Sequence, residues 1–457
     1  MNALVILMFV SAFSSGYLAQ QLQVVPGYAV LIPELLSGIA ALAVLLRLIG
    51  GHGVGLDRRY VAFLALLFFT LAVGFAAQSV APGVIVSGLR NYVKYVPFFL
   101  LAALFSFTDR QLRAQLTVLI AILLFQIPLA VFQRFVQFAD RMHTGDPIRG
   151  MATSSSALSL LMISTIALLV SLYLRRRIKL RLLLAGIAAF MVPTMLNETK
   201  GTVVMLPVAL LAPALFMPPG SRTMRRLVPV LVIGCVALAA FAAAYNLMLR
   251  YGDERPIAEF FTEGDVADYV YTGAADGADR YVGRVDSVLI AARMISDDPF
   301  KLAFGFGAGN VSPSSLPGFG GQYAVYFQSK GVTVTQVANF LWEIGVVGLF
   351  AHLLLYWFVF RDARLLARTN GPFAIYGQVW GSIVILMGIA LMYKSVLNMN
   401  EIAYLFWYFS GLIARNAYLE RAVRRSREVR RRRYLHDSAR EGRQPVEARA
   451  KLRLQWN

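Results

Sequence analysis

The sequence is poor in charge and in cysteine. Charged residues make up 15% of its 457 residues, whereas a soluble domain usually contains about 25%. The single cysteine excludes an intramolecular disulfide and a cysteine-rich metal cluster. The four histidines are far apart along the chain, which disfavours a zinc site with three histidine ligands. These shortages argue against a soluble protein and against a metal-cluster protein.

Long apolar stretches dominate the rest of the chain. Hydrophobic residues make up 58% of the sequence, and a helix needs about 20 mainly apolar residues to cross a bilayer. Twelve stretches approach that length, at 2–19, 25–46, 60–78, 91–107, 114–138, 155–174, 182–199, 201–217, 227–248, 333–360, 374–395 and 400–419. The first lacks a basic leading region and a clear cleavage site, so a span is expected there. The sequence therefore predicts an all-α polytopic membrane protein with about 12 transmembrane helices.

Basic residues indicate how these spans are oriented. Lys and Arg number 16 in the connections on one side, and 14 more follow from Arg415, whereas the short connections on the other side hold seven. Because basic residues concentrate in cytoplasmic loops, both termini are expected in the cytoplasm. The expected divisions are nine spans in 1–248, an extracytoplasmic loop at 249–332, three spans in 333–419 and a basic cytoplasmic tail at 420–457.

The basic tail predicts contact with anionic membrane lipids, which attract Lys and Arg near the bilayer surface. Nucleic-acid binding would need a folded or aromatic-interleaved module. The tail contains no such module, so a nucleic-acid partner is not expected.

The long extracytoplasmic loop predicts an amphipathic helix. Between Arg284 and Ile295 the apolar residues follow the i, i+3, i+4, i+7 spacing of one helical face. Asp297, Asp298 and Pro299 then end this helix. We expect the helix to lie on the outer face of the membrane.

A glycine-rich turn follows this helix, with Gly305, Gly307 and Gly309 at alternate positions. A nucleotide loop is excluded because no GK[ST] sequence follows and because nucleotides are absent outside the cytoplasm. Two interpretations remain open. The turn either returns the chain to the membrane or presents backbone amides to a phosphate outside it.

Charged and polar residues at membrane depth are costly, so they are candidates for function. Arg90 and Lys94 lie four residues apart and share one helical face near the outer surface. Gln336, Asn339 and Glu343 make one face of a later span polar. Further candidates on the outer side are Arg134, His143, Glu198, Lys200 and Lys394. Cations gathered around an outer cavity would suit a doubly charged anionic head group.

Four stretches together resemble one known family. They are LRNYVKYVPFFLL (89–101), LFQIPLAVFQRF (124–135) with TGDPIRGMATSSSALSLL after it, LNETKGTVVMLP (196–207), and the region from GRVDSVLIAARMISDDPFKLAFGFGAGN to VANFLWEIGVVGLF. In order and character these stretches resemble the superfamily of O-antigen polymerases and O-antigen ligases.

The resemblance implies a GT-C-like glycosyltransferase in the bacterial cytoplasmic (inner) membrane, acting on its outer side on sugars linked to undecaprenyl diphosphate. It implies a diphosphate-binding or catalytic role for Arg284, which leads the loop helix, and for Glu343 at the entry of a span. The glycine turn and the pair Arg90 and Lys94 match the family in the same way. A flippase and a chain-length regulator are the implied protein partners.

One departure separates the two branches of this superfamily. Ligases usually have a histidine beside the asparagine at the span entry, whereas this chain has Gln336 near Asn339 and no histidine there. The departure favours a polymerase. Ligase activity and, in a different class, a twelve-span transporter or flippase for lipid-linked oligosaccharides remain as alternatives.

The chemistry of such a polymerase needs no cofactor. Outside the cell the bond energy arrives in the substrate, because a lipid diphosphate leaves readily once its developing charge is stabilised. A metal ion or fixed cations can supply this stabilisation. The first outer loop, GYLAQQLQVV, contains no acidic residue, which favours fixed cations such as Arg90, Lys94, Lys200 and Arg284, so no metal site is expected. Gln336 and Asn339 are candidates for binding the acceptor sugar. Glu343, Glu198 and His143 remain open as the general base.

Overall fold

Helices make up the regular secondary structure of the described chain. The computed structural model describes residues 1–51, 55–141, 145–217, 223–248, 257, 282–314, 318–327 and 331–440, and no strand occurs among them. The helices are α1 (Asn2–Gly16), α2 (Ile32–Ile49), α3 (Arg58–Ala77), α4 (Pro82–Val93), α5 (Val96–Leu104), α6 (Asp109–Phe132), α7 (Ser155–Leu174), α8 (Leu180–Leu196), α9 (Thr202–Leu215), α10 (Thr223–Met248), α13 (Arg284–Ser296), α14 (Pro299–Phe304), α15 (Gln322–Phe327), α16 (Gln336–Ala367), α17 (Ala374–Tyr393) and α18 (Asn400–Arg440). Short 3-10 or π turns are η1 (Tyr17–Gln21), η2 (Gly27–Leu31), η3 (Gln133–Gln137), η4 (Ala139–Arg141) and η7 (Val396–Asn398).

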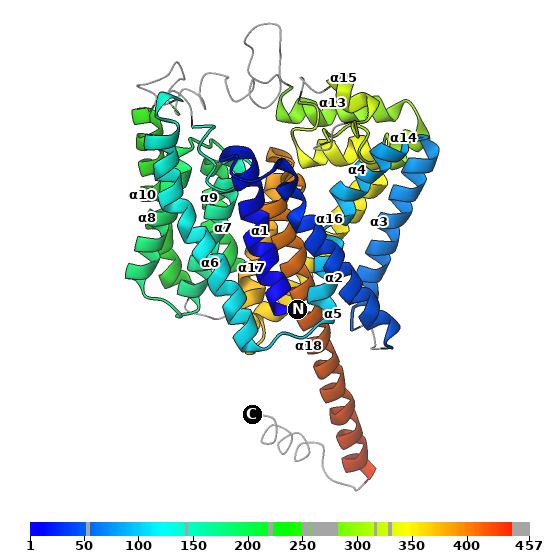
Figure 1. Ribbon diagram of the computed structural model, residues 1–457. Coiled ribbons are helices and arrows are strands. Elements are labelled where there is room, and N and C mark those ends of the chain that lie inside the picture. The colour runs from blue at the N-terminus through cyan, green and yellow to red at the C-terminus, as the bar shows by residue number, and fades with distance from the viewer. Residues whose placement is uncertain are drawn as a thin grey trace.

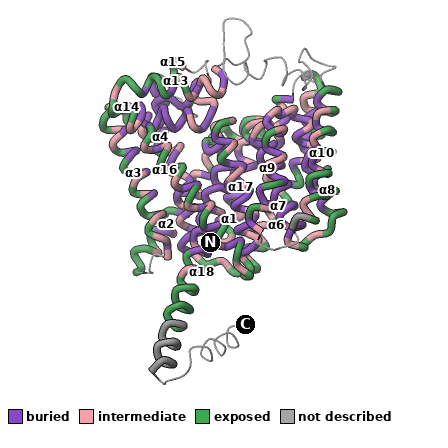
Figure 2. Tube along the Cα trace, turned by 180° about the vertical axis from the view of Figure 1, so that it is seen from behind, coloured by how far each residue is buried: buried purple, intermediate pink, exposed green. Residues whose placement is uncertain are grey.

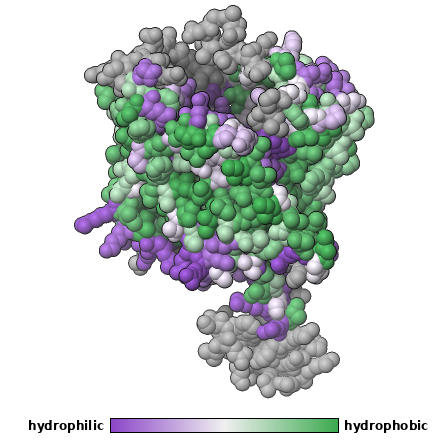
Figure 3. All heavy atoms as spheres, viewed as in Figure 1, coloured by the Kyte–Doolittle hydropathy of each residue, from purple (hydrophilic) through white to green (hydrophobic). Residues whose placement is uncertain are grey.

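Eight of the described helical segments are long and apolar enough to cross a membrane. They contain α1, α2, α3, α6, α7, α10, α16 and α17, while α8 and α9 are shorter apolar helices. In Figure 3 the visible face carries a broad apolar belt between hydrophilic rims. A bundle with an apolar belt of this kind belongs in a bilayer, because the belt would be left against water elsewhere. The chain is therefore a helical, membrane-embedded protein.

The span expected at 91–107 differs from the structure. The chain forms two shorter helices there, α4 and α5, which are separated at Lys94 and Tyr95. Pro97 explains the break, because proline has no backbone N–H to donate to the carbonyl four residues earlier, at Val93, which is the last residue of α4. As a result, Lys94 lies at a helix end, where a backbone turn brings it beside neighbouring segments.

The bundle has two distinct ends (Figure 1). At one end, here called the loop end, lie α13, α14 and α15. At the opposite end, here called the tail end, α1 begins and α18 projects beyond the other helices. Buried residues gather inside the bundle, while residues 422–430 of the projecting part of α18 are exposed (Figure 2).

A network of charged side chains around the buried Asp362 joins helices α3, α16 and α18. Asp362 is 1% exposed and accepts hydrogen bonds from Arg59 Nη2 at 3.0 Å, Arg421 Nη1 at 2.6 Å and the Tyr60 hydroxyl at 2.8 Å. Asp57 caps α3 and also pairs with Arg59 and Arg421. These contacts fix the start of the projecting part of α18 against the bundle.

Helix α13 covers the expected stretch but buries a partly different face. Ser287, Ala291 and Ile295 are its buried residues, and they pack towards α16, whereas Leu289 is 43% exposed. Tertiary packing decides this, because α16 offers a surface to only one side of the helix. The two acids after α13 act locally: the Asp298 carboxylate caps α14 by accepting from the backbone N–H groups of Phe300 and Lys301.

Candidate functional site

A polar cavity opens at the loop end of the bundle. The cavity has a volume of about 300 Å³. It is bounded by the C-terminal end of α1, the N-terminal end of α18, helix α4, and the segments 149–153 and 312–313. Three basic side chains and one acidic side chain line it, namely Arg90, Lys94, Arg149 and Glu401. A cavity of this character suits an anionic group with polar surroundings.

Arg90 and Lys94 reach the cavity from the end of α4 and share one partner. Arg90 Nε lies 2.8 Å and Lys94 Nζ 3.2 Å from Glu34 Oε1, which α2 supplies. Their side chains are 14% and 9% exposed. Among the described residues, one carboxylate thus serves both cations.

Arg149 reaches the cavity on a segment that two glutamines hold in place. Gln133 Oε1 accepts from the backbone N–H groups of Gly150 at 2.7 Å and Arg149 at 3.1 Å, while Gln126 Oε1 accepts from Met151 N at 2.8 Å. The glutamines are seven residues apart, which is two helical turns, so both face the same way. Gly150 has φ +58°, and a Cβ there would clash with Gln126 Oε1. The loop therefore has one tightly defined path.

The Arg149 guanidinium has no acidic partner among the residues that the structure describes. Its Nη1 donates to the Thr153 carbonyl at 3.3 Å, and its Nε is buried without a hydrogen-bond partner in the same part of the chain. Burial lowers the pKa of Arg149, yet a guanidinium stays charged at neutral pH. A charged group with an unused buried donor beside a cavity is able to bind an anion.

Glu401 is the carboxylate that lines this cavity. It lies in the first turn of α18, is 2% exposed, and accepts from Thr153 N at 2.7 Å and from Thr153 Oγ1 at 3.0 Å. These bonds fix the carboxylate beside the three cations. A carboxylate held in this way can accept a proton from a hydroxyl that enters the cavity.

The three polar residues predicted on one face of α16 lie behind the cavity wall. Glu343 Oε1 accepts from Ser312 N at 2.7 Å, and Asn339 Oδ1 accepts from Ser312 Oγ at 2.8 Å. Gln336 Oε1 accepts from Leu397 N at 2.8 Å. Ser312 itself lines the cavity, so these side chains hold wall segments in place in this structure.

Glu198 and Arg134 form a buried pair next to the Arg149 segment. Arg134 Nη2 lies 2.9 Å from Glu198 Oε1, and Arg134 is 1% exposed. Glu198 Oε2 also accepts from Gly145 N at 3.1 Å, which anchors the start of the loop. His143 lies outside the described residues.

Arg284 lies in a second basic group at the loop end. Its Nε donates to the Tyr393 carbonyl at 3.2 Å, and its guanidinium lies 4.6 Å from the centre of the Tyr393 ring. The Tyr393 ring also lies close to the loop that holds Lys200, because a Cβ on Gly201 would lie 2.8 Å from it. Burial, and then the charge of Arg284, lower the pKa of Lys394. The segment from Lys394 to Glu401 therefore joins this group to the polar cavity.

The three glycines of the turn are packed closely against other segments, Gly305 and Gly309 against helix backbones and Gly307 against the Val80 side chain. Gly305, Gly307 and Gly309 have φ values of +72°, +88° and +82°, which favour glycine. A Cβ on Gly305 would lie 2.6 Å from the backbone carbon of Glu343, and one on Gly309 would lie 2.5 Å from the Val84 carbonyl oxygen. The turn thus packs between α4 and α16, and its glycines are not among the residues lining the polar cavity.

Sequence reasoning missed Glu34, Arg149 and Glu401 as site residues. Glu34 and Glu401 lie within apolar stretches, so the cost of a charge at membrane depth was a signal that could have identified both. Arg149 stands in a loop beside Gly150, and no local pattern distinguishes it from a basic residue on the surface. Its importance follows from the long-range contacts of its loop.

The function of this site has to be inferred from the contacts described above. Within the described residues, no group of three or more His, Cys, Asp or Glu side chains could hold a metal ion. No family model matches the chain, and no curated protein matches it.

Proposed function

We propose that the chain is a glycosyltransferase that polymerises oligosaccharide repeat units linked to undecaprenyl diphosphate. In this proposal the twelve expected segments all span the bacterial cytoplasmic membrane, the loop end faces outwards and both termini lie in the cytoplasm. The product is an O-antigen, capsule or exopolysaccharide chain. The observation that carries the proposal is the cavity at the loop end, where Arg149 has no acidic partner among the described residues and Arg90 and Lys94 share one.

The charges of the cavity fit a diphosphate. Three basic side chains face the cavity or its edge, whereas the acidic side chains are Glu401 in the cavity wall and Glu34 beside the cavity. A diphosphate that links a sugar to a lipid carries about two negative charges at neutral pH, and the excess of one cation balances part of this charge. Arg149 is the best placed to bind it, because a guanidinium can donate two parallel hydrogen bonds to phosphate oxygens.

The proposed reaction breaks the bond between the anomeric carbon of the growing chain and its diphosphate oxygen. A hydroxyl at the non-reducing end of a new lipid-linked unit attacks that carbon from the opposite side, so the configuration inverts. The electron pair of the broken bond leaves on the diphosphate, where the cations stabilise the added charge. The hydroxyl proton passes to a carboxylate, and Glu401 is the one that lines the cavity. Glu343, Glu198 and His143 remain alternatives for this role.

A polymerase of this kind must hold two lipid diphosphates, because donor and acceptor are both lipid-linked. The group around Arg284 and Lys394 offers a second cationic position at the same end of the bundle. Its link to the cavity through residues 394–401 gives the two positions a common wall. We assign the cavity to the donor diphosphate and the Arg284 group to the acceptor diphosphate.

A cell-based experiment separates this proposal from its alternatives. Arg149→Ala or Arg284→Ala should abolish long polysaccharide while single repeat units still reach the cell surface, because units are exported but not joined. Loss of the single units as well would indicate a flippase or transporter. Accumulation of long chains still attached to undecaprenyl diphosphate would indicate a ligase. Arg293→Ala is the matched control, since Arg293 is an exposed arginine on α13.

A further inference from the structure

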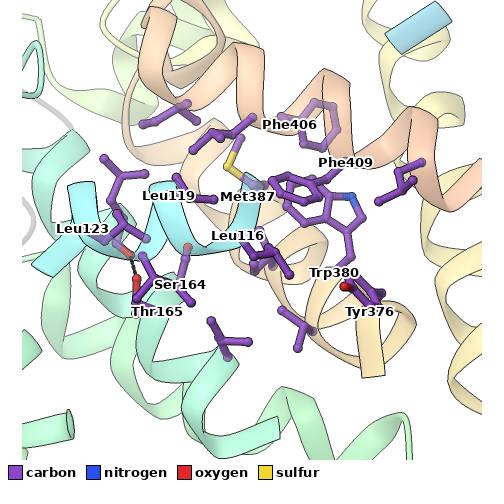
Figure 4. A pocket seen from close by; sticks show the side chains of 18 of the residues that line it. Leu116, Leu119, Leu123, Ser164, Thr165, Tyr376, Trp380, Met387, Phe406 and Phe409 are labelled. Carbon is purple, nitrogen blue, oxygen red and sulfur yellow. Dashed lines mark hydrogen bonds between the residues drawn. The ribbon is translucent and has the colours of Figure 1, made fainter. Parts of the chain in front are cut away.

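An apolar groove lies between α6, α7, α17 and α18 (Figure 4). It has a volume of about 300 Å³. Its wall is built mainly from large apolar side chains, among them Leu119, Leu123, Trp380, Met387, Phe406 and Phe409. Because the four helices come from distant parts of the chain, the groove is a feature of the assembled bundle.

Two of the few polar side chains at the groove are hydrogen-bonded within the bundle. Thr165 Oγ1 donates to the Leu161 carbonyl at 2.8 Å, and Trp380 Nε1 donates to Ser410 Oγ at 3.2 Å. Such a wall offers little to water, and cavities of this kind take apolar ligands instead. The lining of this groove is therefore suited to a hydrocarbon chain.

The groove and the polar cavity approach each other at the start of α18. Glu401 lines the polar cavity and the next residue, Ile402, lines the groove. Both belong to the first turn of α18. A molecule with an anionic head in the cavity and an apolar chain would pass from one to the other at this point.

The length of the groove favours a long apolar chain over a phospholipid acyl chain. Its wall on α17 runs from Ile375 to Met387, which is about 18 Å at the helical rise. Ile375 is the second residue of α17 and Leu172 is close to the end of α7, so the groove reaches the tail end of both helices. A phospholipid acyl chain from the loop end stops at the bilayer midplane, about 15 Å into the hydrocarbon. A polyprenyl chain continues beyond it.

We propose that this groove holds the polyprenyl tail of the lipid substrate whose diphosphate lies in the polar cavity. The inference rests on the proposed function, since it assigns a place to the tail of that substrate. It adds that affinity for the lipid increases with chain length through contacts with α7, α17 and α18. It also makes the first turn of α18 the point where head and tail separate.

Binding of sugar-free lipids to the purified protein tests the groove without requiring catalysis. Ser164→Phe fills the groove from α7, and Leu124→Phe is the control, because Leu124 is 47% exposed on α6 and lies outside the groove lining. Ser164→Phe should weaken binding of undecaprenyl diphosphate about tenfold, as expected from excluding about two buried methylene groups. It should leave the binding of geranyl diphosphate unchanged. Equal binding of undecaprenyl diphosphate by both variants and the wild type would overturn the assignment.

A second measurement uses the wild-type chain, so it does not depend on the folding of a variant. Undecaprenyl diphosphate with a photoreactive group in its tail should crosslink to peptides containing Tyr376 or Leu172. Equal labelling of these peptides by a phosphatidylglycerol with a photoreactive acyl chain would show that ordinary lipid fills the groove and would overturn the proposal. If tail binding holds and no polymer forms in any assay, the proposed function fails while the groove stands.

Discussion

Replacing Arg149 by alanine isolates the cation on which the proposed site depends. The substitution removes the guanidinium that has no acidic partner among the described residues. It leaves the backbone N–H that donates to Gln133, so the loop keeps its anchor. The expected defect is therefore in binding the diphosphate, while the fold of the loop is preserved.

The size of this defect follows from the hydrogen bonds that are lost. Two charge-assisted hydrogen bonds at about 1.5 kcal/mol each, the lower figure for a partly solvated site, amount to about 3 kcal/mol. That corresponds to roughly a 100-fold loss of affinity. Arg149→Lys keeps the charge but loses the planar fork, so a loss of about tenfold is expected.

The assay is binding of undecaprenyl diphosphate to purified variants, followed by chain formation with a lipid-linked repeat unit. Arg293→Ala, on the exposed face of α13, should bind as the wild type does. Thermal unfolding in detergent should be nearly the same for all variants. Wild-type affinity in Arg149→Ala would refute the assignment of Arg149 as the diphosphate receptor.

Three further perturbations follow from other contacts. Asp362→Ala should lower the unfolding free energy by about 3 kcal/mol, because the buried Tyr60 hydroxyl loses its acceptor and Arg59 and Arg421 keep only Asp57. Glu420→Ala, in an exposed helical pair, should change it by less than about 0.5 kcal/mol. Thermal unfolding in detergent measures both. Gly150→Ala should weaken diphosphate binding, since a Cβ there meets Gln126 and φ is +58°; unchanged binding would show that the loop path does not matter. The pKa of Lys394 is lowered in the folded protein, so as the pH rises this side chain loses its proton in the folded protein at a lower pH than in the unfolded chain. The contribution of Lys394 to stability should therefore grow as pH rises from the folded pKa towards the ordinary lysine value. Stability against pH for the wild type and Lys394→Met measures it, and parallel curves would contradict it.

The positions of the helices could be predicted from the sequence because apolar length is a local property. Each of the twelve expected stretches is helical, including the pair that meets at residues 197–201. The division of one stretch into α4 and α5 was missed, although Pro97 marks it. Proline is common in membrane helices, so its presence alone does not decide between a kink and a break.

The candidate site was harder to predict because its contacts join distant residues. Arg90 and Lys94 could be placed on one face from their spacing, but their partner Glu34 is 56 residues before Arg90. Thr153 and Glu401 are 248 residues apart. The buried face of α13 likewise depended on where α16 lies, which periodicity within the helix does not encode. A single sequence records residue types and spacing, whereas the cavity exists only once these segments meet.

Reconstituted activity tests the central claim most directly. Purified protein in vesicles, supplied only with a repeat unit linked to undecaprenyl diphosphate, should produce a ladder of longer glycans. One undecaprenyl diphosphate should be released for each new linkage, and the yield should fall about 100-fold in Arg149→Ala at limiting substrate. Movement of the intact lipid-linked unit across the bilayer, with no ladder and no released diphosphate, would contradict the account.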